Sequence, residues 1–147
     1  MGQDDTKHNL LFISKYPQII HEFTDAMKDR DIEIETAING IEAAAKIKKK
    51  NYDIVITGLS LEGYNGEQII TYLNKTAPST VCIIYTTTIS SAQLHFFINE
   101  RNVFRVFLRP VDFRGAFWEA LEEAYEYHAV QVKNEEDTGA RLSLIHI

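Results

Sequence analysis

The chain has 147 residues, 45% of them hydrophobic and 24% charged, and its formal net charge is −6. This composition is typical of one globular domain and excludes wholesale disorder. The acidic balance argues against nucleic-acid binding, and the single Cys82 cannot form an internal disulfide or a cysteine zinc site. No apolar run approaches the roughly 20 residues of a membrane span, and the polar start of the chain is unlike a signal peptide. We therefore expect a cytoplasmic protein with no nucleic-acid or membrane partner.

Short β-rich runs alternate with helical patterns from the start of the chain. An apolar run at residues 10–13 predicts a strand, and Pro17 follows where the first residue of a helix favours proline. Alternation with a period of two over residues 32–37 predicts a second strand. Asn39-Gly40 ends that strand and begins a helix, whose apolar residues we expect to face inward: Ile41, Ala44 and Ala45.

The rest of the chain repeats this alternation. Continuous apolar runs over residues 52–57 and 81–85 predict strands that are covered on both faces, and residues 103–108 predict a fifth strand. The remaining helices are expected around Ile69 to Leu73, from Ser90 or Ser91 to about Arg101, and from Val111 to about Val132. Five β–α units in a row predict an α/β fold, a doubly wound parallel sheet with helices on both faces.

The last fifteen residues differ in character from the rest. Residues 134–139 are polar, and the apolar residues 142–147 are too few to form a unit of their own. We expect the domain to cover residues 8–132 and residues 133–147 to be a linker or a tail derived from the expression vector. The start of a further domain is the alternative.

Polar side chains follow the carboxyl ends of four expected strands. In an open α/β sheet, ligands bind outside these ends. We therefore expect one pocket of hydroxyls and two cations, built from residues on four loops: Ser14 and Lys15, Thr57 to Ser60, Thr86 to Thr88, and Arg109.

Taken together, these segments resemble the receiver domain of two-component response regulators, over residues 8–129. The resemblance rests on the first strand and its loop at residues 10–17, on the strand at 52–57 with the loop Leu-Glu-Gly-Tyr-Asn-Gly at 61–66, and on Leu108-Arg109-Pro110. In that family the loop after the third strand ends in Gly-x-Asp/Asn-Gly, and a basic residue followed by Pro closes the fifth strand. The resemblance implies a flavodoxin-like three-layer fold with strand order 2-1-3-4-5 and a role in phosphorelay signal transduction.

The reactive positions of the family are changed in this chain. Receivers take a phosphoryl group onto an Asp at the end of the third strand, using Mg²⁺ held by an acidic pair after the first. The resemblance assigns the acceptor position to Gly58 and the acidic pair to Ser14 and Lys15. The other family positions are a hydroxyl kept as Thr86 or Thr87, a lysine replaced by Arg109, and an aromatic residue replaced by Val106.

These replacements remove the groups that the family uses to bind Mg²⁺ and to accept a phosphoryl group. Glycine offers no nucleophile, and the ammonium of Lys15 repels Mg²⁺ by several kcal/mol at an effective dielectric of about 20. Thr57 or Ser60 as a substitute acceptor has no nearby base in the sequence. We expect a degenerate pseudo-receiver that is not an enzyme, holds no metal or cofactor, and acts by protein–protein interaction.

The two cations also support an alternative function. Lys15 and Arg109, together with Thr86 or Thr87, have the chemistry to bind an anion or small ligand, and Arg suits bidentate contact with phosphate. The alternative without a ligand is that Lys15 points to solvent or pairs with Glu62.

A candidate partner face lies on the last expected helix. Val111, Trp118 and Tyr125 recur there every seven residues, beside a core-facing stripe that begins at Phe113. Receivers commonly dimerise or meet partners through the face of helix four, strand five and helix five. With Val106, these residues therefore form the face we expect to meet a second copy, another signalling protein or an output domain. The alternative is that Trp118 closes the core edge and Tyr125 is partly solvated.

Overall fold

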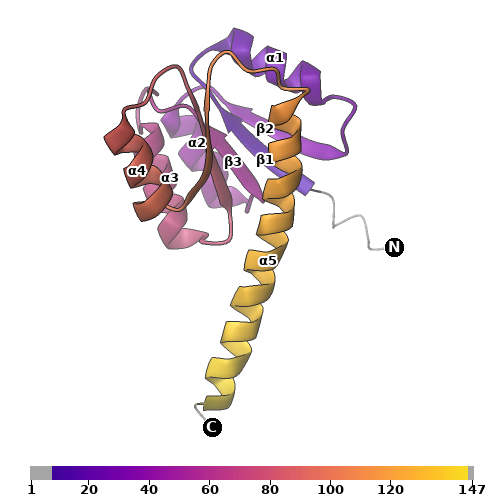
Figure 1. The fold of residues 1–147 in the computed structure, drawn as a ribbon, viewed down its shortest axis with the longest axis vertical. Coiled ribbons are helices and arrows are strands. Elements are labelled where there is room, and N and C mark those ends of the chain that lie inside the picture. The colour runs from indigo at the N-terminus through magenta and orange to yellow at the C-terminus, as the bar shows by residue number, and fades with distance from the viewer. Residues whose placement is uncertain (1–7, 146–147) are drawn as a thin grey trace.

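The computed structural model describes residues 8–145, with side chains through residue 136. Its elements alternate strictly between strand and helix (Figure 1): β1 (His8–Ile13), α1 (Pro17–Met27), β2 (Ile32–Ala37), α2 (Gly40–Lys49), β3 (Ile54–Thr57), α3 (Gly66–Thr76), β4 (Val81–Thr86), α4 (Ser91–Glu100), β5 (Val103–Leu108) and α5 (Ala116–Ile145). All strand pairs are parallel, and the sheet order is β2-β1-β3-β4-β5. The predicted flavodoxin-like fold and its strand order are confirmed.

Side-chain caps explain where three of the helices begin. The Asn39 side chain accepts a hydrogen bond from the backbone N–H of Glu42 at 2.8 Å. Reciprocal capping boxes start α3, between Asn65 and Gln68, and α4, between Ser90 and Gln93. Each box satisfies backbone N–H groups that have no partner inside the helix. Ser90, rather than Ser91, is therefore the cap of α4.

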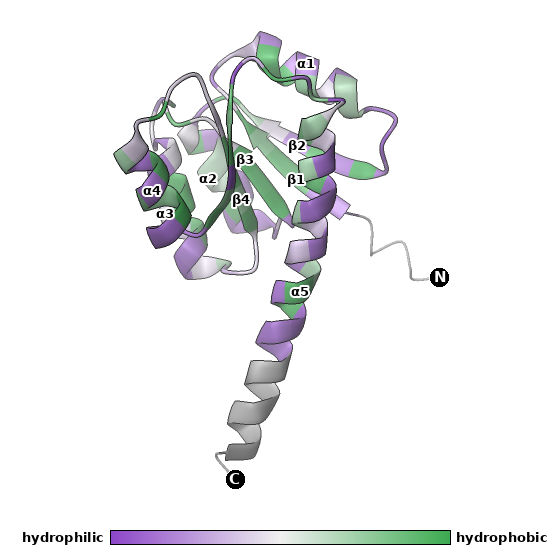
Figure 2. Cartoon of the chain, viewed as in Figure 1, coloured by the Kyte–Doolittle hydropathy of each residue, from purple (hydrophilic) through white to green (hydrophobic). Residues whose placement is uncertain are grey.

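The sheet separates two hydrophobic cores. On one face, alternate strand residues such as Phe12 and Ile56 pack with Phe23 of α1 and Phe117 of α5. On the other face, the intervening strand residues pack with apolar residues of α2, α3 and α4, including buried Phe97. Figure 2 shows the apolar strands at the centre, between helices of mixed hydropathy. Burial on both faces explains why β3 and β4 are continuously apolar in sequence.

Two sequence expectations about helices are wrong. Ile41 is 56% exposed, and Ala43 and Ile47 instead form the buried side of α2. The last helix begins at Ala116, because residues before it form a turn in which Gly115 N–H donates to the Asp112 carbonyl. It then continues to Ile145, beyond the end that the sequence predicted near Val132. Residues 133–145 contain no proline and one glycine, so nothing in the sequence breaks the helix.

Candidate functional site

The carboxyl edge of the sheet holds a small polar pocket with a volume of about 50 Å³. All six residues that the sequence assigned to the degenerate site line it: Ser14, Lys15, Gly58, Thr86, Thr87 and Arg109. They come from the loops after β1, β3, β4 and β5, so the parallel topology alone brings them together.

Hydrogen bonds fix the first of these loops. The Ser14 N–H donates to the Ala37 carbonyl at 3.1 Å, which extends the β1–β2 pairing by one residue. The Ser14 hydroxyl in turn accepts from the Tyr16 N–H at 3.2 Å. Because Ser14 is buried and its oxygen is engaged by the backbone, its role here is to shape the loop that carries Lys15.

Gly58 follows β3 directly, and its N–H donates to the Ile13 carbonyl at 3.0 Å. A Cβ at this position would meet no heavy atom closer than the Tyr85 carbonyl oxygen at 3.7 Å. By contrast, a Cβ at Gly66 would lie 2.2 Å from the Gly58 carbonyl oxygen, so Gly66 is required by close packing. Crowding does not impose a glycine at residue 58, and the missing side chain leaves room in the pocket.

Lys15 and Arg109 both stand over the ring of Tyr16, with the Lys15 Nζ 5.3 Å and the Arg109 Cζ 4.6 Å from its centroid. The Lys15 ammonium donates to the Ser60 hydroxyl at 3.3 Å. Among the residues whose side chains are described, no carboxylate lies within ion-pair distance of either cation. The expected alternative of a Lys15–Glu62 pair is therefore absent from the described side chains, and the pocket carries uncompensated positive charge.

The structure distinguishes the two threonines at the carboxyl end of β4. Thr86 is the last residue of the strand, is half-buried, and accepts the Arg109 N–H at its carbonyl at 2.8 Å. Thr87 is exposed, although it also lines the pocket. The sheet therefore positions the Thr86 backbone, and the Thr86 hydroxyl donates to the Thr88 carbonyl at 3.3 Å.

The partner face expected from the sequence does not exist as one surface. Tyr125 is 7% exposed and belongs to the core beneath α1 and α5, because its ring packs onto the sheet. Trp118 is half-buried, with the Arg30 guanidinium 4.2 Å from its ring centroid. Val111 lies before α5 and packs on the same core, whereas Val106 packs on the core of the opposite face. The three residues with seven-residue spacing therefore lie on one side of the sheet, where the core covers much of their surface, and only Val106 is separated from them by the sheet.

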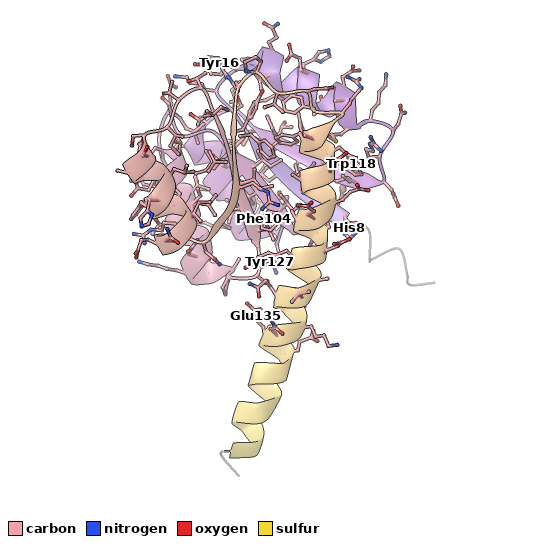
Figure 3. The ribbon with its side chains drawn as sticks, viewed as in Figure 1. His8, Tyr16, Phe104, Trp118, Tyr127 and Glu135 are labelled. Atoms are coloured by element: carbon pink, nitrogen blue, oxygen red, sulfur yellow. The ribbon has the colours of Figure 1, made fainter. Side chains whose placement is uncertain are left out.

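The amino edge of the sheet holds a cluster that sequence spacing did not predict. The Asp53 carboxylate lies 3.1 Å from His128 Nε2 of α5 and 3.7 Å from His8 Nδ1 of β1. It also accepts the Asn9 N–H at 3.2 Å, and the buried Tyr125 hydroxyl donates to the Asn9 carbonyl at 3.0 Å. In Figure 3, His8 lies beside the middle of α5, far from Tyr16 at the other end of the sheet.

The hydrogen bonds of this cluster shift the protonation of its members. The hydrogen bond to Asp53 raises the pKa of His128 above its ordinary value of 6.5, against the effect of burial. Burial alone would raise the pKa of Asp53, but hydrogen bonds from His128 and the Asn9 backbone outweigh it and lower that pKa. Because His128 Nδ1 also lies 2.8 Å from the Ser79 carbonyl, both ring nitrogens face acceptors, which favours the doubly protonated ring.

The family model for the response regulator receiver domain matches residues 11–115, from β1 to the turn before α5. The chain belongs to this family. The receiver family serves two-component signalling and consists of signalling modules rather than enzymes. No curated protein sequence matches this receiver.

Solved structures share the fold at low sequence identity. The signal receiver domain of an HD domain-containing protein from Pseudomonas fluorescens Pf-5 is 19% identical, with a TM-score of 0.79 over 84% of this chain and 98% of that one. An adenylate cyclase structure from Rhodopirellula baltica is 19% identical, with a TM-score of 0.81 over 90% of this chain and 98% of that one. A CheY-like receiver domain protein from Methanospirillum hungatei JF-1 is 18% identical, with a TM-score of 0.76 over 84% of this chain and 98% of that one. These likenesses establish the fold of this receiver.

Two further observations concern only the described part of the receiver. None of its helices combines the length and apolar character needed to cross a membrane. No group of three or more His, Cys, Asp or Glu side chains within it is arranged to hold a metal ion.

Proposed function

We propose that this protein is a pseudo-receiver that acts in two-component signalling without accepting a phosphoryl group on aspartate and without Mg²⁺. The observation that carries the proposal is the pocket itself. Gly58 follows β3 where the family places its phosphoacceptor, and the Lys15 ammonium lies in the same pocket where the family places a metal-binding carboxylate. The module then acts in the cytoplasm by contact with other signalling proteins or an output domain.

The electrostatics of the pocket support this proposal. Mg²⁺ in proteins is held by one or two carboxylates with several waters, and none of the described residues that line this pocket has a carboxylate. The hydroxyl oxygen of Ser14 is already taken by the Tyr16 backbone. The nearby Thr57 hydroxyl donates to the Gly58 carbonyl at 2.8 Å, so it is not aimed into the pocket as a nucleophile.

Incubation with acetyl phosphate and Mg²⁺, followed by intact mass measurement, tests the proposal. We expect no phosphorylated species, and we expect amide NMR signals at Gly58, Thr86 and Val106 to stay unchanged when Mg²⁺ and beryllofluoride are added. Stoichiometric phosphorylation, or saturable shifts at these residues, contradicts the proposal.

Gly58→Asp separates the missing acceptor from the missing metal site. The added side chain fits, since its Cβ makes only ordinary contacts, so a failure to gain phosphorylation is not a failure to fold. We expect the single variant to stay unphosphorylated because Lys15 still repels Mg²⁺. Gly58→Asp combined with Lys15→Asp is the matched variant, and we expect it to gain phosphorylation. Robust Mg²⁺-dependent phosphorylation of the single variant overturns this account of the metal site.

For the protein–protein interaction we propose a partner face that is smaller than the one expected from the sequence. It lies on α4 and β5 and contacts a second copy of the chain. Leu94 and Ile98 are one turn apart on α4, and each is 40% exposed. α4 packs on β5, the edge strand of the sheet, where Leu108 is 50% exposed. An exposed apolar surface beside an open sheet edge favours association, and a twofold dimer brings the same residues opposite each other.

Sedimentation over a range of protein concentrations tests the dimer. We expect a dimer whose dissociation constant rises at least about tenfold in Ile98→Glu, since a buried charge without a partner opposes association. Ile41→Glu is the control, because Ile41 is also exposed but lies on α2. A protein that stays monomeric at every concentration, or equal weakening by both variants, contradicts this face as a dimer interface.

A further inference from the structure

The carboxyl edge of the sheet presents two cations to an open space. Lys15 and Arg109 line one pocket, and each lies over the same Tyr16 ring, at 5.3 Å and 4.6 Å from its centroid. Two positive charges held on one ring repel each other unless a negative charge compensates them. In the described side chains, Lys15 has only the neutral Ser60 hydroxyl as a hydrogen-bond partner.

The pocket also has the size and the donors for a small anion. Its volume of about 50 Å³ is several times the roughly 10–15 Å³ that one water needs. The guanidinium of Arg109 supplies a planar pair of donors that matches two oxygens of a phosphate, and Lys15 supplies a point charge. The Ser60 hydroxyl accepts from Lys15, so its own proton is free to donate.

No neighbouring carboxylate among the described side chains neutralises Lys15 and Arg109. Glu22 of α1 is near enough to influence Tyr85 electrostatically, as Arg109 does, but Glu22 makes no ion pair with either cation. Its carboxylate instead accepts from the Gln18 side chain at 3.5 Å. The missing side chain of Gly58 leaves the space beside the two cations unfilled, although a side chain would fit there.

We propose that this pocket binds a phosphate dianion non-covalently, between Lys15 and Arg109 and over the position of Gly58. This goes beyond the interaction role, because it gives the pseudo-receiver a small-molecule ligand. The ligand is inorganic phosphate or the terminal phosphate of a phosphorylated metabolite, and both offer the same chemistry to the two cations. No bond forms or breaks.

Calorimetric titration of the purified protein with inorganic phosphate at constant ionic strength tests the site. We expect saturable binding to the wild type, weakened at least about tenfold in Lys15→Gln and in Arg109→Gln, because each removes a charged hydrogen-bond donor. Lys49→Gln is the matched control, since Lys49 is an exposed lysine of α2 that does not line the pocket. The control is expected to bind like the wild type. Absence of saturable binding, or equal affinity in all four proteins, overturns the proposal.

Gly58→Asp and Gly58→Asn provide a second measurement that does not remove a cation. Both side chains enter the same space, but only Asp supplies a negative charge that competes with phosphate for Lys15 and Arg109. We expect phosphate to bind at least about tenfold more weakly to the Asp variant than to the Asn variant. Equal and measurable binding by the two variants means that charge does not hold the ligand, which contradicts the proposal, whereas loss of binding in both means that the side chains fill the phosphate position that we propose.

A parallel titration with adenosine monophosphate distinguishes the two sources of phosphate. If inorganic phosphate binds as tightly or more tightly, the ligand is the free ion. If the nucleotide binds more tightly and depends equally on Lys15 and Arg109, the ligand is a phosphorylated metabolite held by its terminal group. A nucleotide effect that survives loss of both cations counts against the site.

Discussion

The two edges of the sheet treat charge in opposite ways. At the amino edge, the carboxylate of Asp53 is compensated by His8, His128 and a backbone N–H, so its charge is used inside the fold. At the carboxyl edge, Lys15 and Arg109 stand over one aromatic ring, and no described carboxylate compensates them. A charge that is paired within the fold, such as that of Asp53, stabilises the native state. The unpaired charges of Lys15 and Arg109 are available to a ligand or partner.

The largest effect on stability is expected at the amino edge. Asp53→Asn removes the charge that faces His8 and the charged acceptor of His128 and the Asn9 N–H, and hydrogen bonds to charged groups contribute about 1.5–3 kcal/mol. We expect the free energy of unfolding, measured with urea, to fall by about 2 kcal/mol. Asp29→Asn, at an exposed position, is the control and should change it by no more than about 0.5 kcal/mol. Equal effects of the two substitutions contradict a structural role for the Asp53 cluster.

The pH dependence of stability sharpens this contrast. The raised pKa of His128 means that its contribution is fully present below pH 6.5 and is lost as pH rises through the folded pKa. The lowered pKa of Asp53 means that its contribution is present above pH 3.8 and is lost as pH falls through the folded pKa. We expect the stability difference between wild type and His128→Asn to be largest between these limits and to shrink above neutral pH. A difference that stays constant from about pH 6 to pH 9 rules out a protonated His128 as the source of the effect.

The smallest effect is expected at the carboxyl edge. Lys15→Gln removes an exposed cation whose described partner is one hydroxyl, so the free energy of unfolding in chloride buffer should change by less than about 0.5 kcal/mol. A slight gain in stability is consistent with relief of the repulsion between Lys15 and Arg109. A loss as large as that in Asp53→Asn means that Lys15 belongs to the fold rather than to a binding site.

The carboxyl edge was predictable from the sequence because the topology of the sheet decides it. Once β1, β3, β4 and β5 are recognised as parallel strands, Ser14, Gly58, Thr86 and Arg109 must meet, whatever their side chains. The amino edge was not predictable in this way. His8, Asp53 and His128 belong to three distant segments, and His128 reaches Asp53 only because of the register in which α5 packs on the sheet.

The helices show the same limit of sequence patterns. An apolar residue at helical spacing is buried only when a neighbouring element covers it. The described residues leave Ile41 56% exposed. Tyr125 differs from its expectation in the opposite direction: its polar hydroxyl suggested partial exposure, but the side chain is buried. Its hydroxyl instead finds the Asn9 carbonyl, which allows the ring to be buried. Local periodicity predicts that a helix forms, but tertiary contacts decide which of its sides is inside.

The length of α5 has a mechanical consequence. Its upper half is fastened to the sheet by Phe117, Tyr125 and His128, whereas its lower half projects away from the sheet in Figure 1. The helix continues for 17 residues beyond His128, to Ile145, which is about 26 Å at about 1.5 Å per residue, so a tilt of about 5° about His128 displaces the far end by about 2 Å. The helix is therefore a lever that pivots at the histidine–aspartate cluster, and a tilt of its packed half by a few degrees becomes a displacement of about 2 Å at its far end.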